Sequence, residues 1–158
     1  MGGAIVPVLR RGMTTHFDHI TIVVRDLEAA KRFFGLLGFA EDKAVVIKGP
    51  QFASYMGVDG IEADHVTLVL TGASPRMEVQ LLRYHHPDPA PDADAGDLTR
   101  LGFNHVCLAV DDLEGEMTRL RAHGVRMRNE MMLFHDRKLV FLWGPEGVTV
   151  ELAEWNRS

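Results

Sequence analysis

Several features that define other protein classes are scarce or absent in this sequence. Its single cysteine, Cys107, excludes an internal disulfide framework and indicates a reducing compartment. No apolar run approaches the ~20 residues of a membrane-spanning helix, and the early apolar stretch 4–9 is shorter than a signal-peptide core. Basic residues are not in excess, because 17 Lys and Arg stand against 22 Asp and Glu, for a net charge of −5. We therefore expect a soluble, cytoplasmic protein that binds neither nucleic acid nor a membrane.

The sequence contains an internal repeat. Residues 17–28 read FDHITIVVRDLE and residues 103–114 read FNHVCLAVDDLE, at an offset of 103 − 17 = 86. A second pair of segments, 77–84 (MEVQLLRY) and 148–155 (VTVELAEW), differs by 148 − 77 = 71. The first copy therefore holds 86 − 71 = 15 extra residues, which we place within 48–62. Matches at both ends of a unit indicate a duplication.

Each copy predicts one strand, one helix and three further strands. Asp26 and Asp112 are suited to cap the helix N-termini, and Gly38 and Gly124 to end the helices. Apolar and alternating runs predict the later strands at about 43–48, 64–70 and 77–84, and at about 125–130, 138–143 and 148–154.

This pattern predicts an α+β fold built from two βαβββ modules. We expect a loose N-terminal tail over residues 1–15 and a single domain over 16–158. Within that domain, module one spans about 16–84, a linker rich in Pro and Asp spans 85–99, and module two spans about 100–156.

Polar residues recur at equivalent positions on the strand faces that point away from the helices. His19 and His105 correspond under the first offset, and Gln80 and Glu151 under the second. If the modules pair about a pseudo-two-fold axis, two imidazoles, an amide oxygen and a carboxylate converge there and suit a divalent cation. The alternative is that each of the four is a hydrogen-bonded residue without a metal. Burying four such groups without a metal or a dense hydrogen-bond network would cost several kcal/mol, which favours the metal site.

The paired modules, the strand histidines and the sequence GPEGVTVEL at 144–152 resemble the vicinal oxygen chelate superfamily. This superfamily includes glyoxalase I, methylmalonyl-CoA epimerase, extradiol dioxygenases and the fosfomycin- and bleomycin-resistance proteins. The resemblance implies a curved eight-stranded sheet around a metal-centred cleft, a small-molecule substrate and a homodimer. It also places the family's four metal ligands on His19, Gln80, His105 and Glu151.

A ligand set of His, Gln, His and Glu is similar to that of methylmalonyl-CoA epimerase and glyoxalase I. The resemblance therefore implies a metal-dependent lyase or isomerase that removes a proton next to a carbonyl and stabilises the resulting enolate or enediolate. Glu151 would serve as ligand and base, and His65 is a second candidate base, because its strand lacks the family's second carboxylate. The ion would be Zn, Ni, Co, Mn or Fe, all of which accept mixed N and O ligands.

The sequence is also compatible with two other functions. An extradiol-type Fe(II) dioxygenase needs only His19, His105 and Glu151, although the tyrosine of its signature is Phe141 in this sequence. A metal-free binding protein of the bleomycin-resistance type would sequester a ligand without catalysis. The four polar positions argue against this last interpretation.

Overall fold

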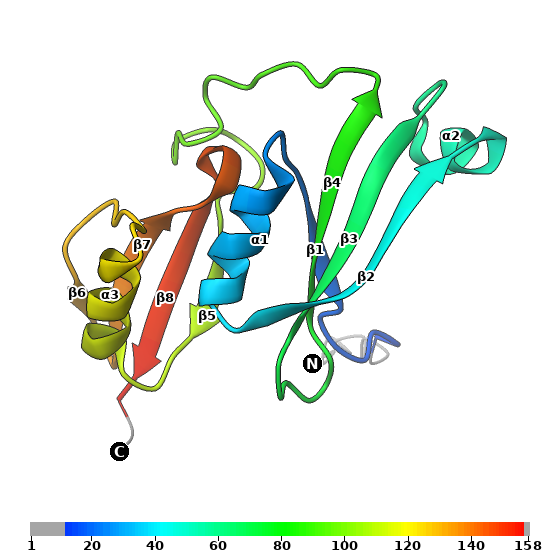
Figure 1. Ribbon diagram of the computed structural model, residues 1–158. Coiled ribbons are helices and arrows are strands. Elements are labelled where there is room, and N and C mark those ends of the chain that lie inside the picture. Colours follow the sequence, from blue (N-terminus) through cyan, green and yellow to red (C-terminus); the bar gives the residue numbers. More distant parts are fainter. Residues whose placement is uncertain (1–11, 157–158) are drawn as a thin grey trace, which may run out of the picture.

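The computed structural model describes residues 12–156, which fold into two modules of the same topology (Figure 1). Module one consists of β1 (His19–Val23), α1 (Leu27–Leu36), β2 (Phe39–Lys48), α2 (Pro50–Met56), β3 (Glu62–Leu70) and β4 (Glu78–His86). Module two consists of β5 (His105–Ala109), α3 (Leu113–Ala122), β6 (Met132–Phe134), β7 (Arg137–Trp143), the 3₁₀ turn η1 (Pro145–Gly147) and β8 (Thr149–Trp155). The α+β class and the two βαβββ modules are confirmed.

The eight strands form two four-stranded sheets, with strand orders β1-β4-β3-β2 and β5-β8-β7-β6. In each sheet the first strand pairs in parallel with the last strand of its module, and the other pairings are antiparallel. Strands β1 and β5 are therefore edge strands, and within residues 12–156 the two sheets do not join into one. The family's single curved sheet is thus present as two halves.

The helices begin and end where local chemistry requires it. The Asp26 carboxylate accepts a hydrogen bond from the Ala29 amide at 2.8 Å, and the Asp112 carboxylate accepts one from the Gly115 amide at 3.0 Å. Gly38 and Gly124 follow the helix ends with φ of +91° and +83°, a region that favours glycine. The predicted caps and stops are confirmed at both helices.

Helix α1 connects the two hydrophobic cores. Its buried residues Ala30 and Phe34 pack on the sheet of module one. Phe33, Leu36 and Leu37, on and just after the same helix, pack against the core of module two, which α3 covers with Leu113, Met117 and Leu120. Helix α1 thus makes apolar contacts with the cores of both modules.

The extra residues of module one form α2, a short helix after β2 that lies in the interval predicted for the insertion. The strand predicted at 125–130 is wrong, because the corresponding strand is β6 at Met132–Phe134. Residues 126–128 still bond to β7, since the Trp143 amide donates to the Arg126 carbonyl and the Arg128 amide to the Phe141 carbonyl. The Asn129 side chain then accepts from the Phe141 amide at 2.8 Å, in place of a backbone carbonyl. This side-chain contact interrupts the ladder.

The linker between β4 and β5 lies against module two through Arg128. This guanidinium donates to the Gly96 carbonyl at 2.8 Å and to the Thr149 hydroxyl at 2.9 Å, and stacks on Trp143 with 3.8 Å to the ring centroid. The predicted tail falls mostly on residues 1–11, which lie outside the described residues, and the predicted domain boundaries stay a prediction. Within residues 12–156 no helix has the length and apolar character to cross a membrane.

Candidate metal centre

Module two brings two of the four predicted ligands into contact. His105 pairs with Thr149 across β5 and β8, and Cys107 pairs with Glu151 in the same ladder. Alternate residues of a strand share a face, so these side chains lie on the face opposite the buried, α3-covered residues of β8. Nε2 of His105 lies 3.1 Å from Oε2 of Glu151, and the side chain of Glu151 is only 13% exposed. The Phe141 ring packs against the imidazole, with 5.0 Å between centroids.

Module one holds the other two predicted ligands on the corresponding face. His19 pairs with Glu78, and Thr21 pairs with Gln80, across the parallel β1–β4 ladder. The Gln80 amide donates to Oε2 of Glu78 at 2.9 Å, and the Thr21 hydroxyl donates to Oε1 of Gln80 at 3.4 Å. Gln80 is thus embedded in a network of polar side chains.

His65 belongs to this network. As predicted, it lies on the face opposite Val66 and Leu68, which are buried on the α1 side of β3. Nε2 of His65 lies 3.1 Å from Oε1 of Gln80. Because the Glu78 carboxylate can only accept, the Gln80 amide nitrogen must face it, and the Gln80 oxygen then faces His65. Nε2 of His65 therefore donates the hydrogen bond, and Nδ1 is the nitrogen that is free to act as a base.

An arginine balances the charge of Glu78. Nε of Arg76 donates to Oε1 of Glu78 at 2.6 Å, and Nη2 donates to the Asp42 carboxylate at 2.8 Å. The hydrogen bond from Gln80, followed by that from Arg76, lowers the pKa of Glu78 below its ordinary value. Glu78 is therefore ionised at neutral pH and holds the amide of Gln80 in place.

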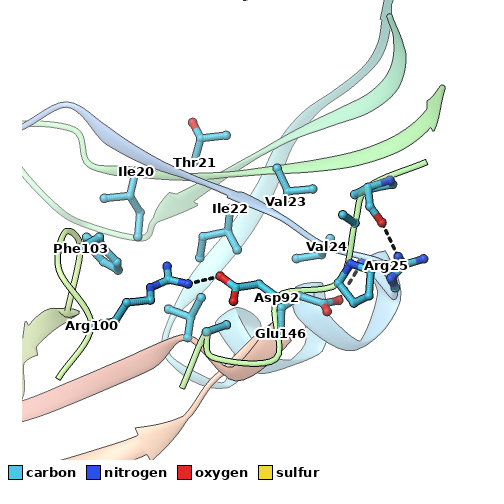
Figure 2. Close-up of a pocket in the computed structure, with 15 residues that line it drawn as sticks. Ile20, Thr21, Ile22, Val23, Val24, Arg25, Asp92, Arg100, Phe103 and Glu146 are labelled. Atoms are coloured by element: carbon cyan, nitrogen blue, oxygen red, sulfur yellow. Dashed lines mark hydrogen bonds and ion pairs between the residues drawn. The ribbon is translucent and has the colours of Figure 1, made fainter. Parts of the chain in front are cut away.

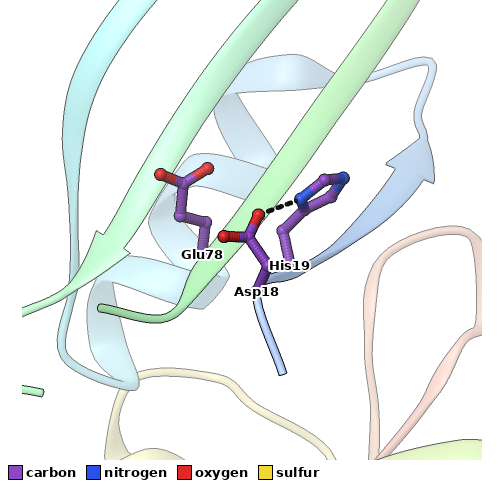
Figure 3. A group of neighbouring side chains, drawn as sticks. All are labelled: Asp18, His19 and Glu78. Carbon is purple, nitrogen blue, oxygen red and sulfur yellow. Dashed lines mark hydrogen bonds and ion pairs between the residues drawn. The ribbon is translucent and has the colours of Figure 1, made fainter. Parts of the chain in front are cut away.

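Figure 3 shows Asp18, His19 and Glu78, whose ligand atoms all lie within 4.8 Å of one another. Within the part of the chain that the structure describes, this is the one group of three or more His, Cys, Asp or Glu residues that meets this spacing. His105 and Glu151 belong to no such group. Within the described chain His105 and Glu151 are in contact in module two, His19 and Gln80 lie on the β1–β4 ladder of module one, and the four do not gather in one cluster.

The residues present fit a divalent ion. Two ligands bound at ~2.0–2.2 Å to one cation lie roughly 3–3.5 Å apart, which matches the His105–Glu151 separation. Imidazole nitrogen with carboxylate and amide oxygen is a donor set that Zn, Ni, Co, Mn and Fe accept. The Asp18–His19–Glu78 group fits less well, because Arg76 already supplies a positive charge to Glu78 and Asp18 already occupies Nδ1 of His19.

Cys107 is an unreactive neighbour of this face. The residue is exposed, yet partial burial of its thiol, together with the charge and hydrogen bond of Glu151, raises its pKa to about 11. The thiol is therefore protonated at neutral pH and is not a nucleophile.

A separate cavity of about 710 Å³ runs along the free edge of β1, beneath the linker (Figure 2). Its apolar lining includes Ile20, Ile22 and Phe103. Among its lining residues, the Arg25 amide donates to Glu146 at 2.7 Å, and Arg100 forms an ion pair with Asp92. None of the four predicted ligands lines it. No motif in the sequence indicated this cavity, because it depends on how the linker folds back.

Comparison with known proteins identifies the family. The model of the Glyoxalase/Bleomycin resistance protein/Dioxygenase superfamily matches residues 18–154. The chain therefore belongs to this superfamily, as the strand histidines and the repeat suggested. Its members include enzymes as well as resistance proteins, so membership alone does not define a reaction.

Individual relatives agree with this assignment. A glyoxalase family protein from Bacillus cereus matches with a TM-score of 0.82 and 22% identity, covering 93% of this chain and 98% of that one. The fosfomycin resistance protein FosX from Listeria monocytogenes, in complex with Mn(II) and sulfate, matches with a TM-score of 0.58 and 15% identity, over 90% and 93% of the two chains. At these identities the likeness concerns the fold.

Among curated proteins, glyoxalase I of Saccharomyces cerevisiae (strain ATCC 204508 / S288c) is 29% identical over 57 residues. That match covers 36% of this chain and 18% of the yeast protein. The chain thus matches less than a fifth of the length of this relative.

Proposed function

We propose that the protein is a metal-dependent enzyme of the glyoxalase or epimerase type, which removes a proton next to the carbonyl of a small oxygenated substrate. The observation that carries the proposal is the contact of 3.1 Å between Nε2 of His105 and Oε2 of Glu151. Complexation of Mn(II) by FosX shows that this fold holds a divalent ion in a relative. When bound by His19, Gln80, His105 and Glu151, such an ion supplies positive charge to a substrate oxygen.

Glu151 is the first candidate base. Its carboxylate is mostly buried and lies on the same face as His105, where a substrate carbon next to the polarised oxygen would sit. A carboxylate that is also a ligand is a weak base, so Glu151 must loosen from the ion to take the proton. His65 is the second candidate, acting through Nδ1, since its Nε2 proton is held by Gln80.

The open face of each pair supports a homodimer that completes the site. His19 and His105 have side chains 41% and 32% exposed. Phe17 and Phe103, two residues before each histidine, are 59% and 61% exposed. Exposed aromatic residues beside half of a ligand set favour contact with a second copy. In the proposed dimer, module one of each protomer faces module two of its partner, so that both sites contain all four ligands.

The test is deuterium exchange at carbon, followed by NMR with a panel of small carbonyl compounds and thioesters in D₂O. The wild-type protein with its metal should exchange the proton of its substrate. Glu151→Gln should keep part of the metal and lose exchange by at least ~100-fold, since general base catalysis contributes about that much. Exchange by Glu151→Gln at the wild-type rate would remove Glu151 from the base role and leave His65→Gln as the variant that should fail.

One observation favours a second function, the extradiol Fe(II) dioxygenase. The Gln80 oxygen accepts from both His65 and Thr21, which leaves His19, His105 and Glu151 as a two-histidine, one-carboxylate set. Phe141 lies against His105, and the absence of the phenol that the extradiol signature has at this position counts against this function. Iron as the resident metal and oxygen consumption with a catechol would favour this function. A protein without any metal would instead be a ligand-sequestering binding protein.

A further inference from the structure

Each predicted histidine ligand is held by the residue that precedes it. Nδ1 of His19 lies 2.6 Å from Oδ2 of Asp18, and Nδ1 of His105 lies 2.7 Å from Oδ1 of Asn104. Asp18 and Asn104 correspond under the same offset of 86 residues that relates the histidines. Two independent copies of the module thus make the same contact with different side chains.

The orientation of each contact follows from its donors and acceptors. The Asp18 carboxylate can only accept, so Nδ1 of His19 carries the proton. The Asn104 amide nitrogen donates to the Leu98 carbonyl at 2.7 Å, which turns its oxygen towards His105. Nδ1 of His105 must therefore donate as well. In the His19 ring this leaves Nε2 with its lone pair directed away from Asp18. Nε2 of His105 instead faces Oε2 of Glu151 at 3.1 Å, a position that takes either a second proton or a cation.

We infer that Asp18 and Asn104 are positioning residues that select the Nδ1–H tautomer of His19 and His105 and so present both Nε2 atoms as metal donors. Ligand histidines in proteins are commonly fixed in this way by a carboxylate or carbonyl on the other ring nitrogen. The metal part of this inference rests on the proposed function, whereas the tautomer part does not. The two positions also differ, because a hydrogen bond to a carboxylate is stronger than one to an amide oxygen. Asp18 therefore holds its histidine more firmly than Asn104 does.

The first test needs no metal. Imidazole ¹⁵N spectra of metal-free protein, recorded at alkaline pH, report the tautomer of His19 directly. We expect the Nδ1–H form in the wild-type protein and in Asp18→Asn, which keeps an acceptor. Asp18→Ala should show the tautomer mixture of an unconstrained imidazole. An Nε2–H form in the wild-type protein, or an unchanged spectrum in Asp18→Ala, would overturn the inference.

The second test measures metal affinity by chelator competition with Zn²⁺. Asp18→Ala and Asn104→Ala should each weaken binding by about 10–100-fold, the effect expected for an outer-shell partner, with the larger loss in Asp18→Ala. Asp18→Asn should recover most of the affinity, and Asp59→Ala, an exposed aspartate outside the site, should match the wild-type protein. Equal affinity in all variants would overturn the positioning role. If the wild-type protein binds no metal, the proposed function fails, while the tautomer spectra still decide the inference.

Discussion

Nε2 of His105 and Oε2 of Glu151 face each other at 3.1 Å across the β5–β8 ladder, and both are acceptors when Asn104 holds the proton on Nδ1. Two acceptors at this distance repel unless a positive charge lies between them. A divalent ion meets this requirement, as does a second proton on the imidazole. The pair thus links the local hydrogen bonding of module two to the proposed metal chemistry.

Metal binding should therefore stabilise the fold. With free Zn²⁺ at about 100 times its Kd, the free energy of unfolding should rise by about 2.7 kcal/mol. His105→Ala should remove most of this gain, whereas His123→Ala, at the end of α3, should retain it. Thermal melts with and without Zn²⁺ make the comparison, and an equal gain in both variants would place the ion elsewhere.

Mixing two inactive variants tests the shared site. If each site combines module one of one protomer with module two of its partner, a dimer of His19→Ala with His105→Ala contains one intact site and one doubly altered site. After subunit exchange at equal amounts, metal content should recover to about a quarter of the wild-type value. A site built within one chain recovers nothing on mixing, and that outcome would contradict the shared site.

The thiol of Cys107 reports on Glu151. With a pKa of about 11, raised first by burial and then by Glu151, only about 1% of the thiol is ionised at pH 9. Alkylation by iodoacetamide at that pH should be roughly 50-fold slower than that of an ordinary cysteine with a pKa near 9. In metal-free Glu151→Gln the carboxylate charge is gone, so the pKa should fall and alkylation should accelerate. The same rate in both proteins would show that Glu151 does not act on the thiol.

The helix cap of α3 should matter for stability and not for the site. Asp112→Ala removes the hydrogen bond to the Gly115 amide and should cost about 1 kcal/mol, or roughly 2–4 °C in Tm. Asp59→Ala is the matched control and should unfold with the wild-type midpoint. Denaturant titrations followed by circular dichroism give both values. A loss below a few tenths of a kcal/mol for Asp112→Ala would show that water replaces the cap.

The parts of the fold that depend on local chemistry could be predicted from the sequence. Asp26 and Gly38 delimit α1 because an N-cap acceptor and a residue with positive φ act within a few residues. The face of His65 followed from strand alternation, since Val66 on its neighbouring position had to be buried. By contrast, the ladder of module two is interrupted by the Asn129 side chain, a contact that periodicity does not reveal.

The candidate site could be predicted only in part for a related reason. The duplication identified equivalent residues and their strand faces. The distances between ligands of module one and ligands of module two, however, depend on how the modules pack. Phe33 and Leu36 contribute to that packing by placing α1 against the second core. The sequence did contain a sign of the roles of Asp18 and Asn104, because each residue directly precedes one of the two equivalent histidines. Their hydrogen bonds became evident only with the side chains in place.

The central claim is that His19, Gln80, His105 and Glu151 hold one metal ion, and elemental mass spectrometry tests it most directly. Protein purified without a polyhistidine tag or chelator should contain about one divalent ion per chain. His105→Ala and Gln80→Ala should each lose most of it. Wild-type metal content in both variants would contradict the ligand assignment. A wild-type protein that stays free of metal after incubation with Zn, Ni, Co, Mn and Fe in turn would contradict the account as a whole.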